Sequence, residues 1–168
     1  MKNLKKVLAL VLVVAMMASF AVSASAASFT DNDKIVYNDA VKLLSTLDVV
    51  NGFTDGSFNP EGNVTRAQTA KMIAFIMNGG EDASSSFASA ANFSDVANGY
   101  WAANSIGYCA TKEIVAGAGN NMYYPNNDVT GVQIAKMALV ALGYDPTIEK
   151  LTGSSWAINT INLAEDAG

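Results

Sequence analysis

The sequence predicts an all-α protein built from helix-loop-helix repeats. Apolar residues recur at helical spacing, a nine-residue pattern returns after 65 residues, and turn-forming loops lie at matching distances. The pattern is clearest in Val64–Met72 (VTRAQTAKM) and Val129–Met137 (VTGVQIAKM). Once an N-terminal leader is set aside, about 140 residues can form one domain with a sizeable core.

Residues 1–27 have the pattern of a secretory signal peptide. Lys2, Lys5 and Lys6 precede an apolar run from Val7 to Ala18, and small residues follow up to position 27. Serines interrupt the run before it reaches the ~20 apolar residues that a membrane span requires. We therefore expect a secreted protein that has no membrane association after the leader is cleaved.

Two full units and the start of a third follow the leader. The first covers residues 28–78, and its expected core stripes are Tyr37, Ala40, Val41, Leu44 and Leu47, then Ala70, Ile73, Ala74 and Met77. The second covers 93–145, with stripes Ala102, Ser105, Ile106 and Cys109, then Ala135, Ala138, Leu139 and Leu142. Residues 79–92 have no such periodicity and predict a surface linker. Residues 146–168 predict an incomplete third unit, because Trp156 matches Trp101.

Each loop between two helices carries residues that favour tight turns. Asp55–Gly56 in the first unit corresponds to Asn120–Asn121 in the second, and these residue types tolerate positive φ. Phe58 and Tyr123 follow at equal spacing and are expected to pack the loop onto its helices.

Composition excludes several classes of function. The chain has a formal net charge of −5, and without the leader seven basic residues face fifteen acidic ones, a net charge of −8. Nucleic acid and anionic membranes repel such a surface. The absence of histidine excludes Ser-His-Asp and Cys-His catalysis, and the single cysteine, Cys109, excludes an internal disulfide. We expect no catalytic residues, no metal site and no cofactor.

The second helix of each unit begins with a capping box. Thr65 with Gln68, and Thr130 with Gln133, have the spacing at which side chains satisfy the first amides of a helix. Arg66 is unusual there, because the helix dipole disfavours a cation in the first turn. It either meets an anionic ligand or pairs with a nearby acid such as Glu61 or Asp55.

The run from Gly52 to Pro60 (GFTDGSFNP), then Val64 to Gln68, resembles the S-layer homology (SLH) family of bacterial cell surfaces. Phe93–Ser94–Asp95 with Trp101, and later Gly143–Tyr144, resemble the opening and close of a second SLH unit. The resemblance implies a pseudo-threefold helical bundle, with residues 28–78, 93–145 and 146–168 as its units.

The resemblance also implies a non-catalytic module that anchors a secreted protein to the cell wall or S-layer. Its partner would be an acidic, pyruvylated secondary cell-wall polysaccharide or a peptidoglycan-linked glycan. Arg66 would meet the ketal carboxylate, flanked by Thr65 and Gln68, and its removal should weaken binding with little loss of fold. Trp101 and Trp156 either pack against a sugar face or are buried in the bundle.

Departures from the family pattern lead to further expectations. Gly131 stands where the second unit should have arginine, so the sequence predicts at most one fully equipped site. The incomplete third unit predicts exposed apolar faces and possible self-association. Alternative functions are the targeting module of an exported wall-active hydrolase, whose catalytic domain follows residue 168, and a lattice-forming protein that touches peptidoglycan.

Overall fold

The computed structural model describes residues 28–90 and 93–167, so the predicted leader lies outside the described residues. This part of the chain contains five α-helices, two short 3-10 helices and no strand, which confirms the all-α class. The elements are η1 (Asn32–Lys34), α2 (Asn38–Thr46), α3 (Arg66–Met77), η2 (Ser85–Phe87), α4 (Ala103–Thr111), α5 (Gly131–Ala141) and α6 (Trp156–Ala167). None of the described helices is both long and apolar enough to cross a membrane.

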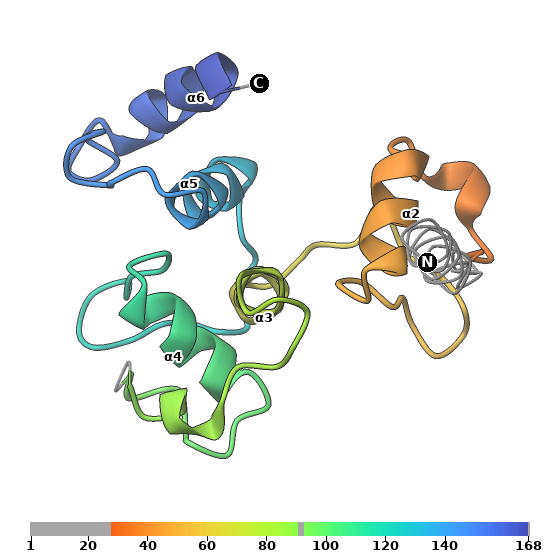
Figure 1. Ribbon diagram of the computed structural model, residues 1–168, viewed down its shortest axis with the longest axis horizontal. Helices are drawn as coiled ribbons and strands as arrows, with labels where there is room; N and C mark the ends of the chain where they lie inside the picture. The colour runs from red at the N-terminus through yellow and green to blue at the C-terminus, as the bar shows by residue number, and fades with distance from the viewer. Residues whose placement is uncertain (1–27, 91–92, 168) are drawn as a thin grey trace, which may run out of the picture.

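Helix α3 is the hub of the molecule (Figure 1). It packs against α4 and α5, while α5 also packs against α6, and α4 against η2. The second helix of each unit therefore pairs with the first helix of the next unit. The largest core cluster contains small residues of α3 and larger ones from the later elements, among them Ala67, Ala70, Ala74, Ile106, Cys109, Tyr123, Met137, Leu139 and Leu151.

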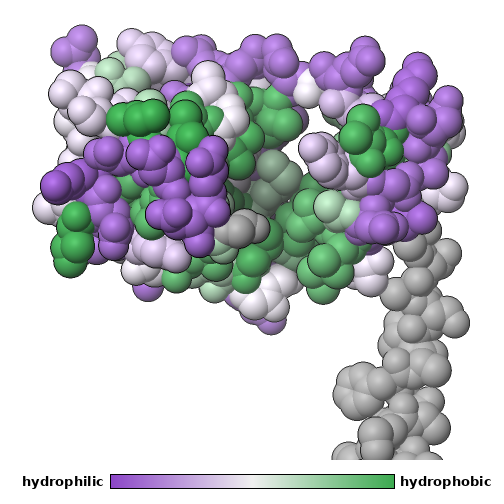
Figure 2. Space-filling model, turned by 90° about the horizontal axis from the view of Figure 1, so that it is seen from above, coloured by the Kyte–Doolittle hydropathy of each residue, from purple (hydrophilic) through white to green (hydrophobic). Residues whose placement is uncertain are grey.

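The N-terminal lobe, residues 28–62, stands to one side of this cluster. It has a small core of its own, in which Phe29 and Ile35 are buried and the ring of Phe58 lies 5.3 Å from that of Phe29. Figure 1 shows α2 apart from the other helices, and Figure 2 shows a hollow between the two parts that is bordered by hydrophobic residues. Residues 66–167 form the main lobe.

The loops of the two full units interlock where α3 and α5 begin. The N–H groups of Arg66 and Ala67 donate to the carbonyls of Asn127 and Pro125, at 2.9 Å each. Val129 N–H donates in turn to the carbonyl of Val64, also at 2.9 Å. The first amides of α3 are thus satisfied by the second unit, which brings Arg66 against the second unit's loop.

One aspartate in each unit fixes its loop. The carboxylate of Asp31 accepts hydrogen bonds from the N–H groups of Phe58 and Asn59, both at 2.8 Å. Asp95 accepts in the same way from Tyr123, at 2.8 Å, and Tyr124, at 2.7 Å. These bonds join the opening of each unit to the end of its loop.

The loop predictions hold. Gly56, Asn120 and Asn121 all have positive φ, as the turn residues require. Tyr123 is fully buried and its ring stacks 5.3 Å from that of Phe93, while Phe58 is half-buried against Phe29.

The predicted core stripes are only partly correct. Ala102, Ser105, Ile106 and Cys109 are buried, but six stripe residues are exposed: Tyr37, Ala40, Leu47, Met77, Ala138 and Leu142. Tyr37 and Leu47 flank α2, which makes no extensive contact with another helix among the described residues, and Leu142 lies at the C-cap of α5. The periodicity predicted the helices but not which of them find partners.

The predicted surface linker covers residues 79–92, and its described part, residues 79–90, is partly buried. Ala83 is 5% exposed, and the ring of Phe87 packs edge-on against Tyr108 at 5.2 Å. Gly107 permits this approach, because a Cβ there would lie 1.8 Å from the carbonyl oxygen of Phe87. The role of the segment as a boundary between units remains a prediction.

Candidate ligand-binding groove

Arg66 is held against the loop of the second unit. Its Nε donates to the carbonyl of Tyr123 at 2.9 Å and its Nη2 to the carbonyl of Ala116 at 3.0 Å. The guanidinium also lies 4.4 Å from the centre of the Tyr123 ring, whose hydroxyl donates to the carbonyl of Arg66 at 3.0 Å. Neither Glu61 nor Asp55 pairs with Arg66; the ion pair found in the described residues joins Lys71 to Asp82.

These contacts leave part of the guanidinium unoccupied. A guanidinium has five N–H donors, and the backbone takes one from Nε and one from Nη2. Three donors therefore remain, and two of them lie on the edge formed by Nη1 and Nη2. Such an edge can donate two parallel hydrogen bonds to a carboxylate or phosphate.

Arg66 borders a groove of about 350 Å³, called here the Arg66 groove. Its walls come from all three predicted units: Arg66, the loop from Ile114 to Ala118, α5 and the segment before α6. No aspartate or glutamate lines it, whereas Arg66 and Lys136 both do. The groove is therefore a cationic site in an acidic chain.

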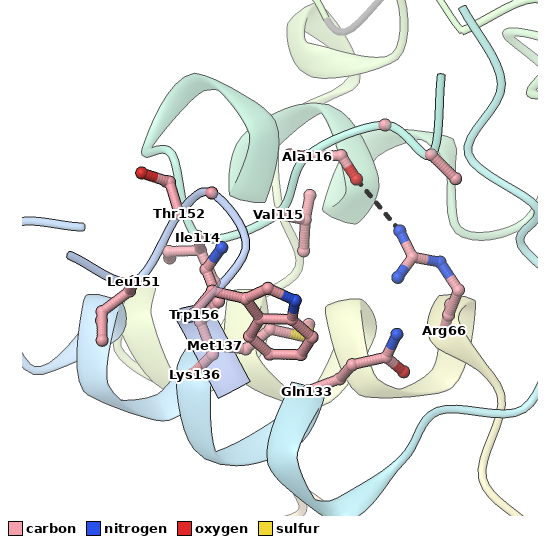
Figure 3. Close-up of a pocket in the computed structure, with 13 residues that line it drawn as sticks. Arg66, Ile114, Val115, Ala116, Gln133, Lys136, Met137, Leu151, Thr152 and Trp156 are labelled. Carbon is pink, nitrogen blue, oxygen red and sulfur yellow. Dashed lines mark hydrogen bonds between the residues drawn. The ribbon is translucent and has the colours of Figure 1, made fainter. Parts of the chain in front are cut away.

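Trp156 and Lys136 form the wall opposite Arg66 (Figure 3). The Lys136 ammonium lies 5.5 Å from the centre of the Trp156 ring, and both side chains are half-buried. Desolvation lowers the pKa of Lys136. Trp156 was predicted as a ligand residue, and the structure places it in the same groove as Arg66.

Gln133 also lines this groove, although the sequence argument treated it as a capping residue alone. Its Oε1 accepts from Thr130 N–H at 2.9 Å, which leaves the amide NH2 group for other partners. Lys136 was missed altogether. The repeat contained the signal that could have found it. Lys136 matches Lys71, but the second unit has Thr147 at the position where the first unit has Asp82.

Thr65 and Gln68 form the predicted capping box, with Thr65 Oγ1 accepting from Gln68 N–H and Gln68 Oε1 from Thr65 N–H. Gln68 lines a different groove, between the N-terminal lobe and α3. Trp101 also lies outside the Arg66 groove: it is 58% exposed and packs at 5.7 Å against Tyr100. The structure thus brings together Arg66 and Trp156, but not Gln68 or Trp101.

The groove between the N-terminal lobe and α3, called here the Lys71 groove, is the repeat equivalent of the Arg66 groove. Val49, Val50, Gln68, Lys71 and Met72 line it, and they match Ile114, Val115, Gln133, Lys136 and Met137. It has no arginine, and the Asp82 carboxylate pairs with the Lys71 ammonium. Its walls are mainly apolar and carry little net charge.

Gly131 does not face the Arg66 groove. It borders a separate hollow between α5 and α6 together with Val132, Ala135, Ile161 and Glu165. The groove that Arg66 enters is made mainly by the second unit and the start of the third, so the glycine does not disable it.

The described residues contain neither a cluster of metal-binding side chains nor an accessible thiol. No group of three His, Cys, Asp or Glu side chains there could hold a metal ion. Cys109 is fully buried, and desolvation raises the pKa of its thiol to about 12. A thiol with such a pKa is unreactive at neutral pH and serves as a core residue.

Comparisons with known proteins agree on one family. A cell surface protein of Thermoanaerobacter kivui is 33% identical over the whole chain, which spans 22% of that protein. A middle cell wall protein of Brevibacillus brevis is 30% identical over 94% of the chain and 14% of its own length. The exoglucanase XynX of Acetivibrio thermocellus is 32% identical over 77% of the chain and 12% of its length.

The chain thus spans less than a quarter of each of these relatives. No solved structure matches it significantly. The family model of the S-layer homology domain matches residues 28–70 and 92–135, which are the two copies of the repeat up to their second helices. The chain belongs to the S-layer homology domain family.

Proposed function

We propose that this protein anchors a surface protein to the bacterial cell wall by binding an acidic, pyruvylated wall polysaccharide in the Arg66 groove. S-layer homology domains are non-catalytic modules that attach proteins to cell-wall polymers. The observation that carries the finer proposal is the unoccupied guanidinium edge of Arg66 in a groove without acidic residues. A pyruvyl ketal supplies one carboxylate, the group that this edge suits.

Two further features support a sugar ligand. Trp156 presents a half-buried aromatic side chain in the groove, and aromatic rings provide a platform for an apolar sugar face. The amide of Gln133 adds a neutral hydrogen-bonding group. Trp101 is a candidate for a separate surface contact, because its indole is largely exposed.

The parent protein has two candidate classes. The first is a surface or S-layer protein, which agrees with the relatives from Thermoanaerobacter and Brevibacillus. The second is a wall-bound polysaccharide hydrolase, because an exoglucanase is among the relatives that match most of the chain. In both classes this chain supplies the attachment and not the chemistry.

A pulldown on purified walls tests the proposal. The chain without its leader should bind intact walls, and binding should fall after mild acid hydrolysis removes the pyruvyl ketals. A soluble pyruvylated hexoside should compete, whereas the same hexoside without the ketal should not. Equal binding to ketal-free walls would contradict the proposal.

Arg66→Ala should weaken binding about 10- to 100-fold, the scale of one charge-assisted hydrogen-bonded contact. Arg66→Lys should also bind less well, because an ammonium lacks the planar fork. Circular dichroism on each variant separates a lost contact from a lost fold.

A further inference from the structure

We propose that Lys136 and Trp156 form a second subsite of the Arg66 groove, which binds the anionic sugar next to the one held by Arg66. The groove would then select a glycan segment with anionic groups on neighbouring repeating units over a single acidic sugar. This inference rests on the proposed function. It adds that the groove recognises the spacing of anionic groups along the polymer.

The groove around Lys136 contains no acidic side chain that could neutralise its charge. The Lys136 side chain is itself half-buried. Within residues 28–90 and 93–167 its ammonium forms no ion pair. Removing a cation from water without a counter-ion is unfavourable, so a bound anion would relieve a cost that the unliganded groove carries.

Trp156 separates the two cations. In Figure 3 its indole lies between Arg66 and Lys136, and the Lys136 ammonium is 5.5 Å from the ring centre. The ammonium lies over the face of the ring, so a sugar packed against this wall of the groove would have Lys136 beside it and Arg66 across the groove. The arrangement therefore suits a ligand longer than one sugar, with charge on both sides of the stacked ring.

The chain contains a matched comparison for Lys136. Lys71 occupies the same place in the first unit, 65 residues earlier, and lines the equivalent groove. Its ammonium is already paired with Asp82, whereas the second unit has Thr147 at the position that matches this acid. Of the two equivalent lysines, Lys136 is the one whose charge remains available to a ligand.

Titration calorimetry on the chain without its leader can test the inference with two probes. One is a methyl hexoside with a single pyruvyl ketal; the other is a wall-polysaccharide fragment of several repeating units with its ketals intact. Lys136→Met keeps the length of the side chain and removes the charge. It should weaken fragment binding about tenfold and change hexoside binding by less than about twofold.

Two control variants make the result specific. Lys71→Met should leave the affinity for both probes unchanged, and Lys136→Arg should retain most of the fragment affinity. Equal losses for Lys71→Met and Lys136→Met, or no loss for Lys136→Met, would overturn the second subsite. A wild-type chain that binds neither probe would instead contradict the proposed function, so the two failures are distinguishable. A thermal melt of each variant, with Lys136→Gln as a second substitution, excludes misfolding as the cause.

Discussion

Helices α2 and α4 occupy equivalent positions in successive units, 65 residues apart in sequence, and they differ in what covers them. Helix α4 packs on α3 and η2, so Ile106 and Cys109 are fully buried. Their counterparts on α2, Val41 and Leu44, are only half-buried. The same sequence pattern therefore forms the same helix in both places, but the partner decides how much apolar surface is buried.

Matching truncations should show this difference most strongly. Ile106→Ala removes a fully buried side chain and should lower the free energy of unfolding by about 3 kcal/mol. Val41→Ala, at the equivalent position, should cost less than about 1 kcal/mol, because water already reaches the side chain. Urea denaturation of residues 28–168, the chain without its predicted leader, measures both. Equal losses would mean that α2 is covered in solution.

A glycine gives the second test of the comparison. Gly107→Ala should lower the free energy of unfolding by about 2 kcal/mol, because the new methyl group would clash with the Phe87 carbonyl. Lys42 is the equivalent residue of α2 and is exposed, so Lys42→Ala should change stability by less than about 0.5 kcal/mol. A neutral Gly107→Ala would show that the segment around Phe87 does not pack closely on α4.

Sequence reasoning succeeded where interactions are local. Both capping boxes could be predicted because each involves residues three apart. The positive φ at Gly56, Asn120 and Asn121 also follows from residue type. The all-α class and the repeat depend on such local patterns and were predicted from them.

Sequence reasoning failed where the outcome depends on neighbours distant in the chain. Nothing near Arg66 indicates that the carbonyls of Ala116 and Tyr123, 50 and 57 residues later, hold its guanidinium. The exposed Tyr37 and the buried Ala83 likewise depend on which helix lies alongside. Lys136 resembles Lys71 in the repeat, and only the structure shows that one is paired with an acid and the other is not.

The interlocked loops allow a third test, at the first residues of α3 and α5. Arg66→Met should lower the free energy of unfolding by about 1.5 kcal/mol, because two carbonyls of the second loop lose their donors. This revises the expectation from sequence that removing Arg66 leaves the fold almost unchanged. Gly131→Ala, at the equivalent position of α5, should raise stability by up to about 0.5 kcal/mol, since the new methyl group meets open space. Thermal melts of both variants measure the two changes. A destabilising Gly131→Ala would contradict the expectation that the first turn of α5 has room for a side chain.

The smallest expected effect is on the pH dependence of stability, and it comes from Asp31 in the N-terminal lobe. The N–H of Phe58 lowers the pKa of Asp31, and the N–H of Asn59 lowers it further. Because the folded-state pKa lies below the unfolded one, the carboxylate stabilises the lobe above the unfolded value, near 3.9. That stabilisation is lost as the pH falls through the folded-state pKa.

Asp31→Asn should therefore lower the melting temperature at pH 7, and the difference from wild type should shrink as the pH falls through the lowered pKa of folded Asp31. The N-terminal lobe lies outside the main core cluster, so the loss should appear first in probes of that lobe. Amide exchange of Phe58 and Asn59 reports on it directly, and that of Tyr123 and Tyr124, which bind Asp95, serves as the internal control. If Asp31→Asn exposes all four amides equally, the N-terminal and main lobes unfold as one unit, and the contrast between α2 and α4 does not extend to their stability.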